Sequence, residues 1–209
     1  MFPSLYAILD RSLLTAPSVE FAGTLAQAGV ELVQLRDKTA AGKLYAEAKE
    51  LVEALAPRSV RLIVNDRADI AAMAGAAGVH VGQDDLPVEE ARAICGRSRW
   101  VGVSTHNLKQ LRHADATSAD YIAVGPIFPT ATKENPDPVV GIDFLREARQ
   151  RTRKPLVAIG GITIESAADV FRAGADSVAV IRDLLSAPDP AARAREYLAI
   201  AERARSMRS

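Results

Sequence analysis

The sequence predicts a TIM barrel, a closed (β/α)8 fold in the α/β class, as a single domain over residues 1–209. Eight short apolar runs recur along the chain, each bounded by Gly, Pro, Asn, Asp or a charged residue. Longer stretches with helical spacing lie between them. Most runs carry branched residues without polar alternation, which is typical of strands buried on both faces of a parallel sheet. Eight such units in series, without a linker, favour a closed barrel over an open doubly wound sheet.

The predicted strands set the order of the elements. They cover residues 5–9, 32–35, 62–64, 79–81, 100–103, 121–124, 156–159 and 178–181. Between the second and third strands, apolar residues from Leu44 to Leu55 repeat at three- and four-residue steps and predict one amphipathic helix. A last helix over about residues 190–205, rich in Ala, Arg and Glu, is expected to close the ring.

A repeat precedes every second strand. Ala28-Gly29, Ala77-Gly78 and Ala173-Gly174 stand before the second, fourth and eighth strands, and Ala119 stands without a glycine before the sixth. Glycine at such a place suits the left-handed residue that ends a helix. The repeat predicts one βα-βα unit used four times. An open nucleotide-binding sheet would need a Gly-rich loop after the first strand, and residues 10–13 contain none.

Composition and charge exclude several classes of protein. Hydrophobic residues make up 48% of the chain, and 26 basic residues balance 26 acidic ones. This is an ordinary globular composition, so we expect neither disorder, nor a nucleic-acid partner, nor a membrane span. A single cysteine, Cys95, and an amino terminus without a basic segment before its short apolar run predict a cytoplasmic protein. The sequence leaves open whether the chain forms a homo-oligomer.

Polar residues follow the predicted strands where a barrel of this class carries its active site, at their carboxyl ends. The relevant segments are Gln34-Leu35-Arg36-Asp37-Lys38, Asn65-Asp66-Arg67, Gly82-Gln83-Asp84-Asp85, Ser104-Thr105-His106-Asn107, residues 125–133 and Gly160-Gly161-Ile162-Thr163. We therefore expect polar groups from six strands to converge on one rim.

Two carboxylates on this rim are candidate metal ligands. Asp66 and Asp85 follow adjacent predicted strands, and oxygen ligands suit Mg²⁺, which usually also takes phosphate oxygens. The alternative is that both are helix N-caps, a common role for Asp just after a strand, with Pro87 in the first helical turn. Their position beside a ring of cations favours the metal.

The cations of the rim predict an anionic ligand. Arg36, Lys38 and Lys133, with Asn65 and Ser104 as neutral donors, match a doubly phosphorylated or pyrophosphate ligand. Lys133 lies in a Pro- and Thr-rich connection over residues 125–141, whose length is typical of a functional segment. The alternative for Lys133 is a solvated surface charge, and Ser104 could instead cap the fifth helix, a role that we assign to Asn107.

Gly160 and Gly161 predict a second anion site, because glycines let backbone N–H groups approach a phosphate at the start of a helix. The alternative is a tight turn that needs positive φ.

Of the histidines, His80 is expected to be packed within a strand, His113 solvated and His106 near the rim. No residue pattern indicates a covalent nucleophile.

These segments, in this order, resemble the thiamine-phosphate synthase family over nearly the full chain. The resemblance rests on residues 34–38, 64–66, 78–85, 102–106, 125–130 with Thr132 and Lys133, and 158–162. It implies a transferase that joins 4-amino-5-hydroxymethyl-2-methylpyrimidine diphosphate to 4-methyl-5-hydroxyethylthiazole phosphate, with Mg²⁺ as cofactor, giving thiamine phosphate and pyrophosphate.

The resemblance also implies roles for individual residues. The pyrimidine diphosphate would be bound by Gln34, Leu35, Arg36, Asp37, Lys38, Asn65, Ser104 and Lys133, of which Arg36, Ser104 and Lys133 would be catalytic. Mg²⁺ would be held by Asp66 and Asp85. The thiazole phosphate would be bound by Thr130, Ala131, Thr132, Gly160, Gly161, Ile181 and Arg182.

Arg182 departs from the family pattern, which usually has a small residue, commonly serine, at this place. We expect the Arg182 side chain to bind the thiazole phosphate directly, against the alternative that its bulk displaces it. Three other functions remain as alternatives: a thiazole tautomerase of the same family, a non-catalytic regulatory paralogue that binds phosphorylated metabolites, and a phosphate-sugar isomerase. None of them explains two acids beside three cations.

Overall fold

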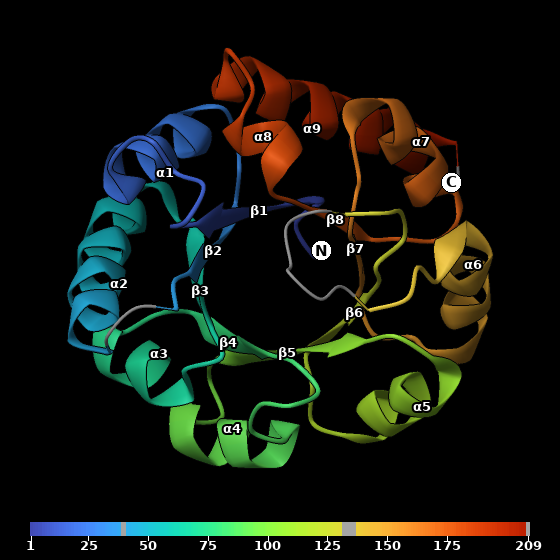
Figure 1. Cartoon of the computed structure of the whole chain (residues 1–209), viewed down its shortest axis with the longest axis horizontal. Helices are drawn as coiled ribbons and strands as arrows, with labels where there is room; N and C mark the ends of the chain where they lie inside the picture. Colours follow the sequence, from blue (N-terminus) through green and yellow to red (C-terminus); the bar gives the residue numbers. More distant parts are fainter. Residues whose placement is uncertain (39–40, 131–136, 208–209) are drawn as a thin grey trace.

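The computed structural model describes residues 1–38, 41–130 and 137–207, and these residues form a closed parallel barrel surrounded by helices (Figure 1). The strands are β1 (Leu5–Asp10), β2 (Leu32–Arg36), β3 (Arg61–Asn65), β4 (Gly78–Val81), β5 (Trp100–Thr105), β6 (Tyr121–Val124), β7 (Leu156–Ile159) and β8 (Ser177–Val180). Each strand pairs with the next, and β8 pairs with β1 through the register Leu5 to Val178. The predicted (β/α)8 fold is confirmed.

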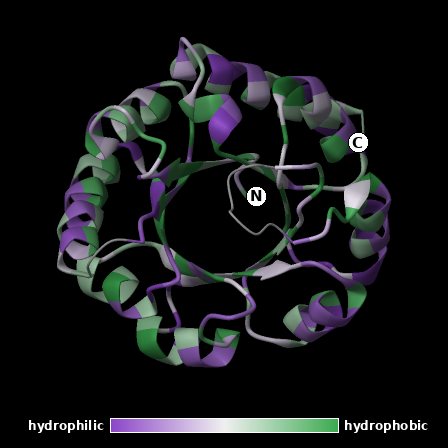
Figure 2. Cartoon of the chain, in the orientation of Figure 1, coloured by the Kyte–Doolittle hydropathy of each residue, from purple (hydrophilic) through white to green (hydrophobic). Residues whose placement is uncertain are grey.

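The helices lie outside the ring of strands. They are α1 (Ser18–Gln27), α2 (Ala41–Leu55), α3 (Ala68–Ala74), α4 (Val88–Cys95), α5 (Leu108–Ala116), α6 (Gly141–Arg151), α7 (Ile164–Arg172), α8 (Arg182–Leu185) and α9 (Pro190–Ser206), with a 3-10 turn, η1 (Ala56–Arg58), after α2. Hydrophilic residues colour the outward side of the helices, and hydrophobic residues dominate the central ring (Figure 2). Among the described residues, no helix is long and apolar enough to cross a membrane.

Alternation along the strands divides the buried residues into two cores. On β1, Leu5, Ala7 and Leu9 pack outward against the helices, whereas Tyr6 and Ile8 point into the barrel. The inner core is small and includes aromatic rings, which fill the lower part of the barrel. This alternation decides which side chains after each strand reach the open end of the barrel.

Six of the eight strands differ from their predicted bounds by one or two residues, and β6 and β7 match. The eighth strand ends at Val180, one residue early, because the chain enters the short helix α8 at Arg182 before the closing helix α9. Gly78 lies within β4 and does not end a helix; the left-handed residue that ends α3 is Gly75. Gly78 is needed because a Cβ there would lie 2.2 Å from the Trp100 carbonyl oxygen. Gly29 and Gly174 have positive φ, as predicted.

Candidate active site

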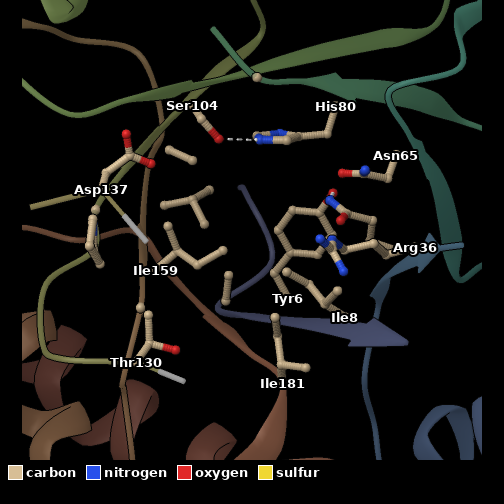
Figure 3. Close-up of a pocket in the computed structure, with 18 of the residues that line it drawn as sticks. Tyr6, Ile8, Arg36, Asn65, His80, Ser104, Thr130, Asp137, Ile159 and Ile181 are labelled. Carbon is tan, nitrogen blue, oxygen red and sulfur yellow. Dashed lines mark hydrogen bonds between the residues drawn. The ribbon is translucent and has the colours of Figure 1, made fainter. Parts of the chain in front are cut away.

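A cavity of about 550 Å³ opens at the carboxyl end of the barrel, where the polar segments were expected to meet. Its described lining includes residues from all eight strands or the loops that follow them. Ser104, His80 and Asn65 lie in the upper part of the view in Figure 3, Arg36 and Ile159 lie on either side of its middle, and Ile181 lies below them. The cavity therefore combines a polar wall with an apolar one, which suits a ligand with a ring and a charged group.

The segment after β2 alternates between the cavity and its surroundings. Gln34, Arg36 and Lys38 line the cavity, as predicted from their position. The side chain of Leu35 is fully buried in the outer core, so it does not reach a ligand in the cavity. Asp37 is half-buried and is not part of the cavity lining. Leu35 can therefore reach a ligand only through its backbone.

Asp10, which the sequence analysis missed, holds Arg36 in place. Its carboxylate is almost fully buried and pairs with the Arg36 guanidinium. It also accepts hydrogen bonds from the backbone N–H of Ser12 at 3.0 Å and from the Ser12 hydroxyl at 2.6 Å. Asp10 and Arg36 are directly opposite in the register of β1 and β2. Adjacent strands that end in Asp and Arg were a signal in the sequence for this pair.

Asp66 and Asp85 are brought together and are not helix caps. The cap position of α3 is Arg67 and that of α4 is Pro87, so the N-cap alternative is wrong for both carboxylates. Asp66 has a φ of 63° and Asp85 accepts a 2.8 Å hydrogen bond from the Gly82 N–H. Both side chains line the cavity, on the same wall as Arg36 and Lys38. Positive φ is costly for a residue other than glycine, and functional sites often contain residues with such a strained backbone.

The donor set of this wall fits Mg²⁺. Burial, the charge of Asp85 and a hydrogen bond between the two carboxyls raise the pKa of Asp66 to about 6, while Arg36 and Lys38 lower it. Two carboxylates this close repel each other unless a cation or a proton lies between them. Among the described residues no third acidic, His or Cys side chain completes a cluster, and Mg²⁺ commonly takes one or two carboxylates with waters and substrate phosphates.

The raised pKa of Asp66 gives a prediction for the metal-free protein. The folded state keeps a proton on Asp66 up to a pH of about 6, whereas the unfolded chain releases it near 3.8. The folded state then binds more protons than the unfolded state, so its free energy of unfolding falls as the pH rises through this window. We expect the wild type to lose stability relative to Asp66→Asn as the pH rises from about 3.8 to about 6, which are the pKa values of Asp66 in the unfolded and folded states. Urea unfolding of both proteins at several pH values measures it, and parallel stability curves would contradict it.

The opposite wall is built from the turn after β7 and the loop after β6. Gly160 and Gly161 have φ values of 100° and 61°. A Cβ on Gly160 would lie 2.5 Å from the Pro126 Cβ, and one on Gly161 would lie 2.4 Å from the Pro129 carbonyl oxygen. The tight turn is therefore present, and it lies beside the cavity just before α7. Its role as a phosphate site stays a prediction, and the turn leads directly into α7, where such a site would lie.

The remaining predicted ligand-binding residues lie in three places. Asn65 and Ser104 line the cavity, and Ser104 does not cap α5, whose N-cap is Asn107 as predicted. Thr130, Ile181 and Arg182 also line it, with Arg182 at the exposed first residue of α8. Ala131, Thr132 and Lys133 lie outside the described residues.

Sequence reasoning missed several lining residues. His80 is buried in β4 as predicted, yet it lines the cavity and its Nε2 lies 2.9 Å from the Ser104 hydroxyl oxygen. Tyr6 and Ile8 point inward from β1. His106, expected only near the rim, lies with its Nδ1 2.6 Å from the Gly125 carbonyl and its Nε2 3.4 Å from Asp137. Inward alternation on β1 was the one available signal for Tyr6 and Ile8.

Comparison with known proteins agrees with this arrangement. A sequence profile of the family described as thiamine monophosphate synthase matches residues 5–184, which span β1 to the first residues of α8. The chain belongs to the thiamine monophosphate synthase family. A thiamine-phosphate synthase from Koribacter versatilis is 53% identical over 204 residues, covering 95% of each protein. One from Methanospirillum hungatei is 42% identical over 195 residues, covering 92% of this chain and 95% of the relative.

A solved structure within this family also matches the fold. The thiamine phosphate pyrophosphorylase from Pyrococcus furiosus superimposes with a TM-score of 0.88 at 32% identity, covering 96% of each chain. The family is one of transferases, and the expected resemblance is confirmed. Membership in the thiamine monophosphate synthase family extends over the barrel and the cavity, because the profile includes every strand.

Proposed function

We propose that this chain is a thiamine-phosphate synthase that joins a pyrimidine methylene to a thiazole nitrogen in the cavity. The bond between the methylene carbon of 4-amino-5-hydroxymethyl-2-methylpyrimidine diphosphate and its diphosphate oxygen breaks. A carbon–nitrogen bond forms to 4-methyl-5-hydroxyethylthiazole phosphate, and pyrophosphate leaves. One observation carries the proposal: in a chain of this family, Asp66 and Asp85 line the cavity close to Arg36 and Lys38.

The polar wall supports departure of the diphosphate. Arg36 and Lys38 supply fixed positive charge, and Asn65 and Ser104 add neutral donors on the same side of the cavity. Charge placed in advance, where negative charge develops, lowers the barrier without reorganisation during the reaction. Asp66 and Asp85 would hold Mg²⁺, which when bound supplies Lewis acidity to the leaving phosphate oxygens. Lys133 remains a predicted additional cation from the loop after β6.

The apolar wall supports the heterocycles. Ile8, Ile159 and Ile181 give the cavity an apolar part of its lining (Figure 3). The amino group of the pyrimidine stabilises the methylene cation that forms as pyrophosphate leaves, so the protein needs no strong base. Its task is to hold the thiazole nitrogen in line and to keep water away from the cation. The Gly160–Gly161 turn across the cavity is our candidate for the thiazole phosphate site, at the start of α7.

The carboxylate pair also argues against the other functions. A thiazole tautomerase does not need groups for a diphosphate or a metal, and a phosphate-sugar isomerase would need only the glycine turn. A non-catalytic paralogue would have lost the metal position. In this chain Asp66, Asp85, Arg36 and Lys38 all line one cavity.

We place the reaction in the cytoplasm, on the single buried cysteine and the composition of the chain.

Incubation of the pure protein with both substrates, with and without Mg²⁺, tests the function. Thiamine phosphate and pyrophosphate should appear together in equal amounts, and only when Mg²⁺ is present. Isomerisation of a tautomer of a related thiazole phosphate, with no thiamine phosphate formed in the main assay, would identify a tautomerase instead. If neither product forms with both substrates and Mg²⁺ present, the proposal is wrong.

Arg182 gives a second, narrower prediction. Its exposed side chain lines the cavity at the start of α8, one residue after the apolar Ile181. If Arg182 binds the thiazole phosphate, Arg182→Ser should raise the KM for that substrate about tenfold, since it removes one charge-assisted hydrogen bond. The KM for the pyrimidine diphosphate should not change. A KM for the thiazole phosphate that stays constant or improves would show that Arg182 hinders this phosphate.

A further inference from the structure

A row of hydrogen bonds crosses the barrel interior below the cavity. The Gln34 side-chain amide donates to the Tyr6 hydroxyl at 2.7 Å. The Tyr6 and Tyr121 hydroxyl oxygens are 3.0 Å apart. The Tyr121 oxygen lies 3.1 Å from Nδ1 of His80, and Nε2 of His80 lies 2.9 Å from the Ser104 oxygen. Gln34, Tyr6, His80 and Ser104 line the cavity, and Tyr121 is fully buried beneath it.

Packing buries both tyrosines of the row. Tyr6 and Tyr121 are 1% and 0% exposed. Their rings meet edge to face at a centroid distance of 5.9 Å, and the His80 ring stacks on Tyr121 at 5.6 Å. Burial raises the pKa of both tyrosine hydroxyls, so each keeps its one proton. Each hydroxyl then has one donation to make, and a neighbour in the row must accept it.

The orientation of the Gln34 amide sets the direction of the row, and in this structure its nitrogen faces Tyr6. An amide with its oxygen and nitrogen exchanged would reverse every donation and place the His80 proton on Nδ1, so the tautomer of His80 reports which orientation is present. Because the Gln34 amide donates to the Tyr6 oxygen, the Tyr6 proton is left for Tyr121. Tyr121 accepts that proton and points its own at Nδ1 of His80. A neutral imidazole that accepts at Nδ1 carries its proton on Nε2, which then donates to the Ser104 oxygen. The Ser104 hydroxyl proton is thereby left for the cavity.

With the Gln34 nitrogen facing Tyr6, the opposite direction leaves a buried proton without an acceptor. If Ser104 donated to His80, Nδ1 would donate to Tyr121 and Tyr121 to Tyr6. Tyr6 would then receive two donations, and within the described chain its own proton would meet no acceptor. A buried hydroxyl proton without an acceptor raises the free energy of the folded state, and the first arrangement avoids this cost.

We propose that Tyr6 and Tyr121 are positioning residues that hold His80 as the neutral Nε2–H tautomer and so make the Ser104 hydroxyl a dedicated hydrogen-bond donor to an anionic oxygen of the ligand. The inference rests on the proposed function in one respect, that a phosphorylated ligand occupies this cavity. It adds that one donor of the polar wall is oriented from beneath, through side chains that need not touch the diphosphate. Ordering of the hydroxyl before the ligand arrives removes a cost of binding.

The tautomer can be measured directly without any ligand. In protein labelled with ¹⁵N in its histidine rings, His80 should show a pyridine-type Nδ1 and a pyrrole-type Nε2 at neutral pH, with its signals assigned by their loss in His80→Gln. In Tyr121→Phe, which keeps the ring and removes the hydroxyl, the two tautomers should become mixed. A protonated Nδ1 in the wild type, alone or in an imidazolium, would overturn the proposal.

Binding of inorganic pyrophosphate with Mg²⁺ tests the consequence for Ser104. Calorimetric titration should give a dissociation constant about tenfold weaker for Ser104→Ala, the usual size for one hydrogen bond to a charged group. Tyr121→Phe should weaken it about threefold or more, and Tyr121→Phe/Ser104→Ala should match Ser104→Ala alone. Additive losses in the double variant, or unchanged affinity in Tyr121→Phe, would overturn the proposal.

A matched control removes another tyrosine hydroxyl outside the row. Tyr45 on α2 packs against the outer core, and Tyr45→Phe should bind pyrophosphate as the wild type does. Neither measurement needs the reaction to occur. A wild-type protein that shows the expected tautomer and binds pyrophosphate but makes no thiamine phosphate would therefore refute the proposed function and leave this inference standing.

Discussion

Replacement of both Asp66 and Asp85 by asparagine is expected to lower kcat about a thousandfold or more at saturating Mg²⁺. Asparagine keeps the size of each side chain and an oxygen that can accept the Gly82 N–H bond, but it removes the negative charge. Loss of a cation that stabilises a phosphate leaving group is worth several kcal/mol in the transition state. Initial rates of thiamine phosphate formation across a Mg²⁺ titration measure the effect.

The same double variant should remain folded. The two carboxyls lie together in a partly buried place where the charge of Asp85 and burial raise the pKa of Asp66. Removal of both charges relieves that repulsion, so the metal-free variant should be at least as stable as the wild type at neutral pH. A loss of activity together with unchanged or higher stability separates a metal site from a structural ion cluster.

Asp69 provides the matched control for this experiment. It is a nearby carboxylate on α3 that pairs with Arg67 at the surface, and it does not line the cavity. Asp69→Asn should keep the rate and the Mg²⁺ dependence of the wild type. An Asp66→Asn/Asp85→Asn enzyme with the same Mg²⁺ dependence as Asp69→Asn would show that the two carboxylates do not hold the metal.

The sequence was sufficient for the fold and for the residues at strand ends. Apolar runs report burial on both faces of a strand, and Asp66 and Asp85 follow two such runs that a barrel must place side by side. Once the order of strands is known, the carboxyl ends meet at one rim. Arg36 and Lys38 reach the cavity because they follow the inward parity of Gln34, whereas Leu35 has the outward parity.

The sequence was insufficient where a residue acts through a neighbour on another strand. Tyr6 and Tyr121 are 115 positions apart, and their contact across the interior follows from the register of the closed barrel, which no local pattern encodes. His80 was expected to be a packed histidine, and it is buried, but its two ring nitrogens serve Tyr121 and Ser104. Burial can be predicted from an apolar run; the partners of a buried polar group cannot.

The ion pair of Asp10 and Arg36 carries the second large expected effect. Arg36→Met should lower kcat/KM for the pyrimidine diphosphate about 100- to 1000-fold, the usual cost of one preorganised charge contact to a developing anion. It should also lower Tm by about 10 °C, because the buried Asp10 carboxylate loses its cation and such a loss costs about 3 kcal/mol or more. Steady-state kinetics and thermal unfolding measure the two effects separately.

A second substitution separates the structural role of Arg36 from its role toward the ligand. In Asp10→Asn/Arg36→Met the buried charge is gone and asparagine still accepts the Ser12 hydrogen bonds, so Tm should return to within a few degrees of the wild type, about 3 °C. Activity should not return, because no guanidinium faces the cavity. Recovery of both would show that Arg36 serves only to neutralise Asp10.

Arg92 and Asp120 form an ion pair outside the cavity, with side chains 13% and 36% exposed, and they supply the control. Arg92 also donates to the carbonyl oxygens of Arg99 and Ser118, so Arg92→Met should lower Tm too, although by less than Arg36→Met because Asp120 keeps contact with water. It should leave kcat/KM within about twofold of the wild type, since no ligand contact is lost. If kcat/KM of Arg92→Met fell as far as that of Arg36→Met, general destabilisation would explain the loss of activity in both variants. The reason is that Arg92 lies outside the cavity and has no contact with the ligand to lose.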